Sequence, residues 1–508
     1  MKLTTLLSIS LASLLLPSMY TFAATTPPNM IWIMADDLGY GEVSIMPGRF
    51  NTNISTPNID QLFQSGTRFT DAYCGQAVCA PSRASLMTGY NQGKCWIRGN
   101  NGGTDGHGLP LRPNPLDLTY LNILQSNGYH VACIGKWGLG WVDNSGAPHL
   151  KGCDEYFGVL DQNYAHNMYP TLANFTWRYP ASDGSLKYES IPYPENVNAS
   201  RQRCMGNPSS CTWTHDLWTN AALTTIQNQA EGKYVNEDGS TKPIFIYLAY
   251  TDPHAGGWSG TEEVGNPVPS DGNFANETWP YEEIDHASVI QNFLDRDVGR
   301  IVSALETNKL RDSTAIFFAS DNGASNEGNH DYMFFGSSGP LRGFKRCLTE
   351  GGIRTAFAVS WPGTIPAGVV TNYTVAFWDM MPTIIDMAGI SSSTLPSDID
   401  GISVWNVLSG QGNIPTHPPL YWEFCTSAHP PGVNRTGPGW GHAVRMDNWK
   451  GVSFFEDQPL FLYDLATDLG ETTDVASQHP TIISQMEAYA KKSHVDNPNF
   501  PIKNCVPS

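Results

Sequence analysis

Three continuous apolar runs, each ending in polar residues, constrain the fold of this 508-residue chain more than any other feature. They cover residues 30–34, 244–248 and 315–318. Uninterrupted apolar runs of this length are typical of strands that are buried on both faces of a mainly parallel sheet. The segments between them carry helix signals, and alternating strands and helices predict an open α/β sheet. In such sheets, ligands bind beyond the carboxyl ends of the strands.

The helix signals are of two kinds. Thr56 and Pro57 are placed to begin a helix that Gly66 ends, because Thr caps helices and Pro fits their first turn. Apolar residues spaced three and four apart over residues 289–305 predict a longer amphipathic helix.

Acidic pairs follow the first and third apolar runs. Asp36 and Asp37 follow the first, and Asp321 and Asn322 follow the third. Three carboxylates and an amide oxygen are hard ligands, which suit Ca²⁺ or Mg²⁺ better than a thiophilic metal. Either pair alone is more simply interpreted as turn residues after a strand. Together, at the ends of two buried strands, they favour a metal site.

The charge and the N-terminus restrict the partners and the compartment. A formal charge of −19 gives the chain no global attraction for nucleic acid or anionic membranes. Lys2, an uncharged Leu-rich run over residues 3–16 and small residues up to Ala23 predict a signal peptide over residues 1–23. This run is short for a membrane anchor, and no other stretch approaches membrane-spanning length. We therefore expect a secreted or periplasmic protein without a membrane span.

Ten cysteines are compatible with an oxidising compartment. Cys204 and Cys211 lie seven residues apart and are predicted to form a local disulfide, whereas the spacing of the other cysteines leaves their pairing open.

Cys79 stands two residues before Pro81, which places it at the N-terminal end of a predicted helix. Free N–H groups and the helix dipole favour an anion there, and Arg83 adds a positive charge one turn further on. The alternative is a buried cysteine before an ordinary helix.

Residues 77–89 match the sulfatase signature Cys-x-Pro-Ser-Arg followed by a hydrophobic pair and Thr-Gly. By this segment the chain resembles the formylglycine-dependent sulfatases, and in particular the bacterial type with a Gly-Lys-Trp-Gly motif. The resemblance runs over roughly residues 28–478, with Glu42 where the family frequently has Asp. The other matching segments are residues 36–41, 128–137, 320–323, 341–354 and 462–465.

The resemblance implies an alkaline-phosphatase-like α/β fold, with a large, mainly parallel sheet flanked by helices over residues 24–390. A smaller antiparallel-sheet subdomain is expected over residues 391–508. The resemblance also implies that a formylglycine-generating maturation enzyme converts Cys79 to formylglycine (3-oxoalanine). One hydroxyl of its hydrate would attack sulfur, and the other would later expel sulfate. The implied ligands of one Ca²⁺ are Asp36, Asp37, Asp321, Asn322 and the modified Cys79.

Further catalytic roles come from the same resemblance. Arg83, Lys136 and Lys345 would neutralise the nucleophile and the sulfate oxygens. His254 would protonate or bind the leaving-group oxygen, although by itself it could be a loop histidine. Arg98 and His330 are additional candidates for substrate contact.

The chain departs from the family at Gly138, where many sulfatases have a histidine that acts on the second formylglycine hydroxyl. His166 lies in a segment that resembles one found in sulfatases with Gly-Lys-Trp-Gly. We predict that it replaces the missing base and faces the Cys79 pocket. A structural loop histidine is the alternative.

The sequence thus predicts a calcium-dependent sulfuric ester hydrolase that acts on a sulfated carbohydrate. Two alternatives stand beside it: a formylglycine-dependent phosphonate or phosphodiester hydrolase, and an inactive relative that binds sulfated glycans. The intact motif around Cys79 disfavours the inactive relative, because a binding protein needs no nucleophile. The sugar, the sulfate position, endo or exo action and the oligomeric state are left open.

Overall fold

The structure is a computed structural model, which describes residues 27–50, 53–102, 107–162, 164–171, 176–258 and 264–507. The predicted signal peptide lies outside the described residues. No helix among the described residues is long and apolar enough to cross a membrane.

The three apolar runs form adjacent strands at the middle of a large sheet. β1 (Asn29–Ala35) lies between β7 (Ile244–Ala249) and β8 (Thr314–Ser320) and is parallel to both. All residues of these strands are buried, which confirms the prediction. Ala35 pairs with Ser320 and Met34 with Ala249, so the three strands end at one edge of the sheet.

Further strands extend this sheet on both sides. β3 (His130–Lys136) pairs in parallel with β7, and β9 (Arg354–Ser360) pairs antiparallel with β8, so the sheet is mixed but mainly parallel. The described strands follow the order β10-β2-β9-β8-β1-β7-β3-β4-β5-β6, with β11 beside β2. The remaining strands are β2 (Thr67–Tyr73), β4 (Glu155–Val159), β5 (Trp177–Tyr179), β6 (Glu189–Ser190), β10 (Val369–Thr371) and β11 (Val375–Ala376).

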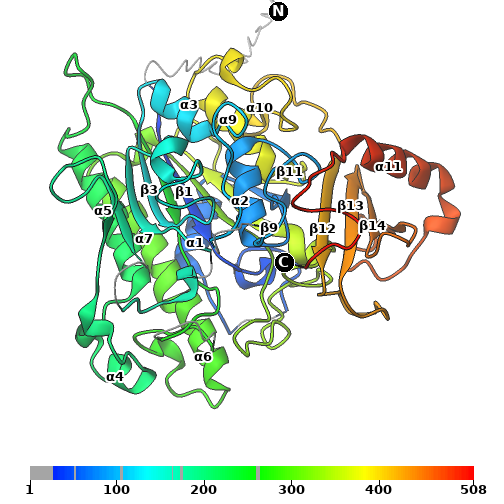
Figure 1. The fold of residues 1–508 in the computed structure, drawn as a ribbon, viewed down its shortest axis with the longest axis horizontal. Coiled ribbons are helices and arrows are strands. Elements are labelled where there is room, and N and C mark those ends of the chain that lie inside the picture. Colours follow the sequence, from blue (N-terminus) through cyan, green and yellow to red (C-terminus); the bar gives the residue numbers. More distant parts are fainter. Residues whose placement is uncertain are drawn as a thin grey trace, which may run out of the picture.

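Helices cover both faces of the sheet, and β1 shows the division. Its residues Met30, Trp32 and Met34 pack on one face, and Ile31 and Ile33 on the other. Figure 1 shows the two helical layers on either side of the sheet. The first layer holds α2 (Cys79–Thr88), α3 (Tyr120–Ser126) and α9 (Met380–Met387), and the second holds α1 (Pro57–Gln64), α5 (Thr214–Ala230) and α7 (Arg296–Thr307). Shorter described helices are α4 (Arg201–Gly206), α8 (Glu350–Ile353) and α10 (Trp405–Ser409).

The predicted helices exist, but their details differ from the expectation. α1 begins at Pro57 as predicted and ends at Gln64, and the Thr56 side chain does not cap it. Asp295 does so instead: its Oδ1 accepts the N–H groups of Asn58 and Ile59, both at 2.9 Å. The helix predicted over residues 289–305 is interrupted, because α6 (Tyr281–Ser288) leads into α7 through the π-helical segment η7 (Val289–Asp295).

A separate antiparallel sheet follows in the C-terminal part, at the right of Figure 1. α11 (Pro480–Ser493) packs against it, and the smaller antiparallel sheet that the resemblance implies is thereby confirmed. The strands are β12 (Leu420–Thr426), β13 (Gly439–Met446), β14 (Trp449–Ser453) and β15 (Phe461–Asp464).

Disulfides close loops in both parts. Cys204 and Cys211 are bonded as predicted. The spacing had left open the two other disulfides of the described residues, Cys133–Cys153 and Cys425–Cys505.

Candidate active site

Cys79 is the first residue of α2 and is completely buried. Its Sγ lies 3.3 Å from Asp36 Oδ1, to which the thiol donates a hydrogen bond. Burial raises the pKa of the thiol well above its usual value, and the neighbouring Asp36 carboxylate raises it further. An unmodified Cys79 is therefore a neutral thiol at physiological pH, with little nucleophilic character.

Asp36 lies between two cations. Lys136, the last residue of β3, donates a 2.6 Å hydrogen bond to Asp36 Oδ2, and the Arg83 guanidinium lies 3.3 Å from the same oxygen. Burial alone would raise the pKa of Asp36, but these two cations hold it well below its usual range. Asp36 is therefore an ionised carboxylate that is fully buried.

Asp321 and Asn322 join the group from the end of β8. Arg83 binds Asp321 Oδ2 through Nε and Nη2, at 3.0 and 2.8 Å. Burial and the charge of Asp36 raise the pKa of Asp321 to about 6. The Asn322 amide donates to Asp37 Oδ1 at 2.7 Å, whereas Asn322 Oδ1 is buried without a hydrogen-bond partner among the described residues.

This donor set fits a divalent cation. Ligand atoms of Asp36, Asp37, Cys79 and His254 all lie within 4.8 Å of one another. A buried amide oxygen without a partner is costly unless something binds it, and Asn322 Oδ1 has no partner among the described residues. The donors among the predicted ligands are mainly oxygens, as a hard cation requires. The structure therefore brings the two predicted acidic pairs and Cys79 into one cluster.

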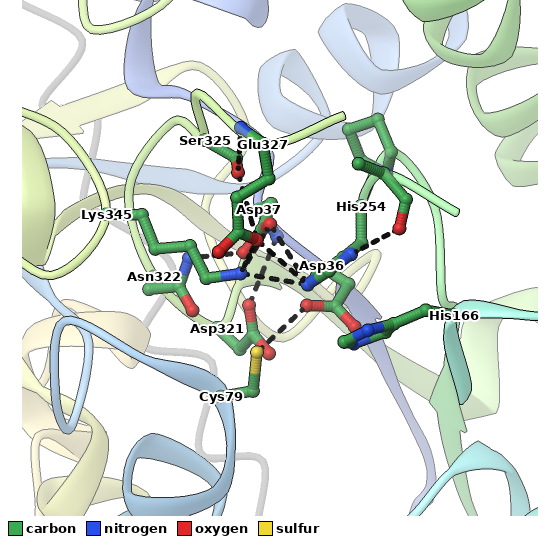
Figure 2. Close-up of polar contacts among 12 residues, drawn as sticks. Asp36, Asp37, Cys79, His166, His254, Asp321, Asn322, Ser325, Glu327 and Lys345 are labelled. Atoms are coloured by element: carbon green, nitrogen blue, oxygen red, sulfur yellow. Dashed lines mark hydrogen bonds and ion pairs between the residues drawn. The ribbon is translucent and has the colours of Figure 1, made fainter. Parts of the chain in front are cut away.

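Lys345 connects this cluster to His254. Its Nζ donates to Asp37 Oδ2 at 2.8 Å and lies 2.8 Å from His254 Nε2. His254 Nδ1 lies 2.7 Å from the Ala255 carbonyl oxygen, so Nδ1 carries the proton and Nε2 accepts from Lys345. Figure 2 shows these side chains meeting around the two aspartates. His254 is thus held in one tautomer.

Glu327 is a site residue that the sequence analysis missed. Its Oε2 accepts from Lys345 at 2.6 Å and lies 3.3 Å from His254 Nε2, and Oε1 accepts from Arg346. Burial would raise the pKa of Glu327, but the Lys345 and Arg346 cations keep it well below its usual value. The only sequence signal is an acid in the loop that also carries Asp321, which is too common a feature to select it.

His166 also lies at this cluster. Its ring stacks on that of His254 with centroids 3.7 Å apart, and its Nε2 lies 3.4 Å from Lys136 Nζ. Gly138 stands at the position where many relatives have a histidine. Its φ is +71°, and a Cβ added there would lie 2.6 Å from Gln162 Oε1. A side chain at position 138 would therefore strain the backbone and require the Gln162 amide to move.

Two predicted substrate residues lie outside the cluster. Arg98 is buried, forms an ion pair with Glu423 and donates to three main-chain carbonyls. His330 is also buried and forms part of a second polar cluster with Glu42 and His286.

Comparisons with known proteins agree with this geometry. The family model described as Sulfatase matches residues 28–390, and the model described as N-sulphoglucosamine sulphohydrolase, C-terminal, matches residues 343–495. The chain therefore belongs to the sulfatase family and is a hydrolase of sulfate esters.

Individual relatives support the same conclusion. Arylsulfatase A of Bos taurus is 30% identical over 471 residues, which are 88% of this chain and 83% of that protein. The crystal structure of Ps i-CgsB in complex with k-i-k-neocarrahexaose superposes with a TM-score of 0.71 at 25% identity, over 94% of this chain and 96% of that one. The structure of BT4656 in complex with D-glucosamine-2-N,6-O-disulfate shares the fold, with a TM-score of 0.62 at 19% identity over 92% and 97% of the two chains.

The contacts of Glu327 generate a prediction. Glu327→Gln keeps the shape of the side chain but removes the charge that holds Lys345 and His254. We expect kcat to fall about 10–100-fold, as is typical for residues that orient catalytic groups, with a smaller change in KM. Steady-state kinetics with an aryl sulfate measures both constants. Glu306→Gln, on the exposed side of α7, is the matched control, and equal kinetics of the two variants would contradict the assignment.

Proposed function

We propose that this chain is a calcium-dependent sulfatase that removes sulfate from a carbohydrate, with Cys79 as the precursor of a formylglycine nucleophile. The observation that carries the proposal is the position of Cys79. It lies buried at the start of α2, beside Asp36 and within the cluster that Arg83, Lys136 and Lys345 neutralise.

The residues that would hold the calcium ion are Asp36, Asp37, Asp321, Asn322 and residue 79. When present, the ion and the formylglycine hydrate supply charge stabilisation at the sulfate oxygens and an oxygen nucleophile for sulfur. The buried, unpartnered Asn322 Oδ1 supports this assignment.

The cations of the chain bind and orient the sulfate. Lys136 and Lys345 approach the cluster from different strands and loops, and their ammonium groups lie within hydrogen-bond distance of Asp36 and Asp37. An incoming sulfate shares these fixed positive charges, together with the N-terminal N–H groups of α2. No side chain has to move from solvent, so the site is preorganised for an anion.

Two histidines handle protons in this proposal. The leaving-group oxygen needs a proton, and the His254–Lys345 pair holds one in an N–H···N contact of 2.8 Å. Regeneration of the site needs a proton to be removed near residue 79. We assign this step to His166, and the 3.4 Å distance between its Nε2 and Lys136 Nζ, next to Asp36, supports the assignment.

A carbohydrate substrate is supported by the relatives rather than by the site alone. Ps i-CgsB binds k-i-k-neocarrahexaose, an oligosaccharide, and it resembles this chain over nearly its full length. The signal-like N-terminus is compatible with an extracellular sugar. Maturation requires a formylglycine-generating enzyme as a partner.

The first prediction tests the nucleophile. Peptide mass spectrometry of active protein should show a loss of about 18 Da at Cys79, the conversion of thiol to aldehyde. Cys79→Ala should reduce release of sulfate from sulfated saccharides and an aryl sulfate to background while the circular dichroism spectrum is unchanged. Full activity with an unmodified Cys79, or faster turnover of a phosphodiester than of any sulfate ester, would refute the proposal.

The second prediction concerns the metal. Asp321→Ala removes a charged ligand, so we expect calcium affinity to fall by at least about tenfold, and turnover to fall with it. Isothermal titration of chelator-treated protein with CaCl₂ measures the affinity. Asp312→Ala, at an exposed position before β8, should behave as the parent chain. Unchanged calcium binding in Asp321→Ala would show that the ligand set is wrong.

The third prediction separates the two histidines. In His166→Ala the alcohol should still be released once, so rapid-mixing kinetics should show a burst about equal to the enzyme concentration, followed by slow turnover. In His254→Ala the first release itself is impaired, so the burst should be absent. His479→Ala, before α11, is the control. A His166→Ala enzyme with normal steady-state rates would exclude His166 as the base.

A further inference from the structure

His215 is a buried histidine that plays no part in the proposed mechanism. It is the second residue of α5, and its side chain is closed off from solvent. Its ring stacks on those of Trp213 and Tyr250, with centroids 4.8 and 4.4 Å away and both planes within 19° of its own. Packing therefore fixes the plane of the imidazole.

Each ring nitrogen of His215 faces a buried carboxylate. Nδ1 lies 2.9 Å from Asp252 Oδ2, and Nε2 lies 3.3 Å from Asp297 Oδ2. An ionised carboxylate can only accept from the ring, so Nδ1 donates to Asp252. Burial alone would lower the pKa of His215, but the two carboxylates raise it to about 9. The ring is thus an imidazolium at neutral pH.

The two carboxylates differ in how much they depend on His215. Asp297 also forms ion pairs with Arg296 and Arg300. Asp252 Oδ1, in contrast, is buried without a hydrogen-bond partner among the described residues, and Asp252 Oδ2 is bound by His215. A buried carboxylate without compensation is costly. The position of the Asp252 side chain therefore depends on His215.

Asp252 lies in the turn that connects β7 to His254. The His254 N–H closes this turn on the Thr251 carbonyl oxygen at 3.1 Å, so Asp252 and Pro253 are its central residues. The carbonyl oxygen of Asp252 accepts the Asp36 N–H, also at 3.1 Å. This turn thus joins the main chain of Asp36 to that of His254.

We infer that His215 is a positioning residue of the sulfatase reaction. By holding the Asp252 side chain, it fixes the turn on which the positions of Asp36 and His254 depend. The inference rests on the roles that the proposed function gives to these two residues. His215 acts through Asp252 rather than by contact with the substrate.

The position of this turn affects the reaction rate more than it affects sulfate binding. Asp36 is hydrogen-bonded to Lys136, and His254 Nε2 accepts from Lys345. A shift of about 1 Å in a reacting group can lower a rate about 100-fold. The two lysines lie on other segments, so the binding of sulfate depends less on the turn. Loss of the bond to Asp252 therefore lowers kcat more than it raises KM.

A purely structural role is the alternative. In that role His215 serves only to pack α5 against α7, which carries Asp297. The two roles use different ring nitrogens, because Nδ1 faces the turn and Nε2 faces α7. An experiment that keeps one contact at a time separates them.

Two substitutions of His215 keep one contact each. The amide nitrogen of Asn lies near the position of Nδ1, so His215→Asn keeps the bond to Asp252. The longer Gln places its amide nitrogen near the position of Nε2, so His215→Gln keeps the contact with Asp297 instead. Both amides are neutral donors, so the two variants are matched in charge.

Steady-state kinetics with an aryl sulfate at saturating CaCl₂ compares the full-length variants, well below the melting temperature of each. We expect kcat of His215→Gln to fall about 10–100-fold with a smaller change in KM, and kcat of His215→Asn to stay within about threefold of the parent chain. Equal kcat values in the two variants, whether high or low, would overturn the inference.

A third variant protects the test if His215→Gln does not fold. Asp252→Ala removes the other end of the same bond and leaves no buried charge in the turn. We expect it to lower kcat about as much as His215→Gln, and the double variant to be no slower, because both substitutions break one bond. A parent-like kcat in Asp252→Ala, or additive losses in the double variant, would contradict the inference.

The same experiment keeps this inference apart from the proposed function. Peptide mass spectrometry gives the formylglycine content of each preparation, and kcat is expressed per modified chain. If Cys79 is unmodified in active protein, kcat is expressed per chain and the ratio between the two His215 variants is still measured. Failure of the nucleophile assignment and failure of the positioning role therefore give different results.

Discussion

The buried carboxylate of Asp36 is the group on which the geometry of the active site depends. Transferring an ionised acid from water into the protein costs several kcal/mol unless opposite charges and hydrogen bonds compensate for it. Lys136 at the end of β3, and Arg83 and the Cys79 thiol in α2, provide this compensation. The position of Cys79, the end of β3 and the first turns of α2 are therefore all tied to one carboxylate.

The same balance extends over the whole cluster. Four acidic side chains face an equal number of basic ones, so the site is close to neutral as the chain alone provides it. A divalent cation makes it positive, which suits a sulfate monoester that arrives with one negative charge. This local balance also explains how a chain with a formal charge of −19 can bind an anion. The acids are Asp36, Asp37, Asp321 and Glu327, and the bases are Arg83, Lys136, Lys345 and Arg346.

The sequence predicted the parts of this site that lie at strand ends. A continuous apolar run identifies a buried strand, and the polar residues after it must emerge at the carboxyl edge of a parallel sheet. Asp36 and Asp321 follow neighbouring strands for this reason, and the register of β1 with β8 brings them together. The Cys79 motif added the proposed nucleophile through its resemblance to a family. These predictions rest on local patterns, which a single sequence contains.

The features that were missed depend on the paths of loops. Glu327 reaches Lys345 because the segment after Asn322 folds back over the site, and no periodicity encodes that path. The cap of α1 by Asp295 joins residues 237 positions apart, and the contact of His286 with Glu42 spans 244. A π-helical segment between α6 and α7 likewise follows from packing, since its sequence reads as ordinary helix.

The two polar clusters share a structural logic. Reacting groups must be held within about 0.5 Å of their working positions, and loops alone rarely achieve this. Here the loop after β1 carries Asp36 and Asp37 at one end and Glu42 at the other, so a bond at Glu42 restrains both aspartates. Asn266 does the same for His254. Support and chemistry are thus placed in adjacent clusters, so the hydrogen bonds of Glu42 and Asn266 fix these loops without using the side-chain atoms of Asp36, Asp37 or His254.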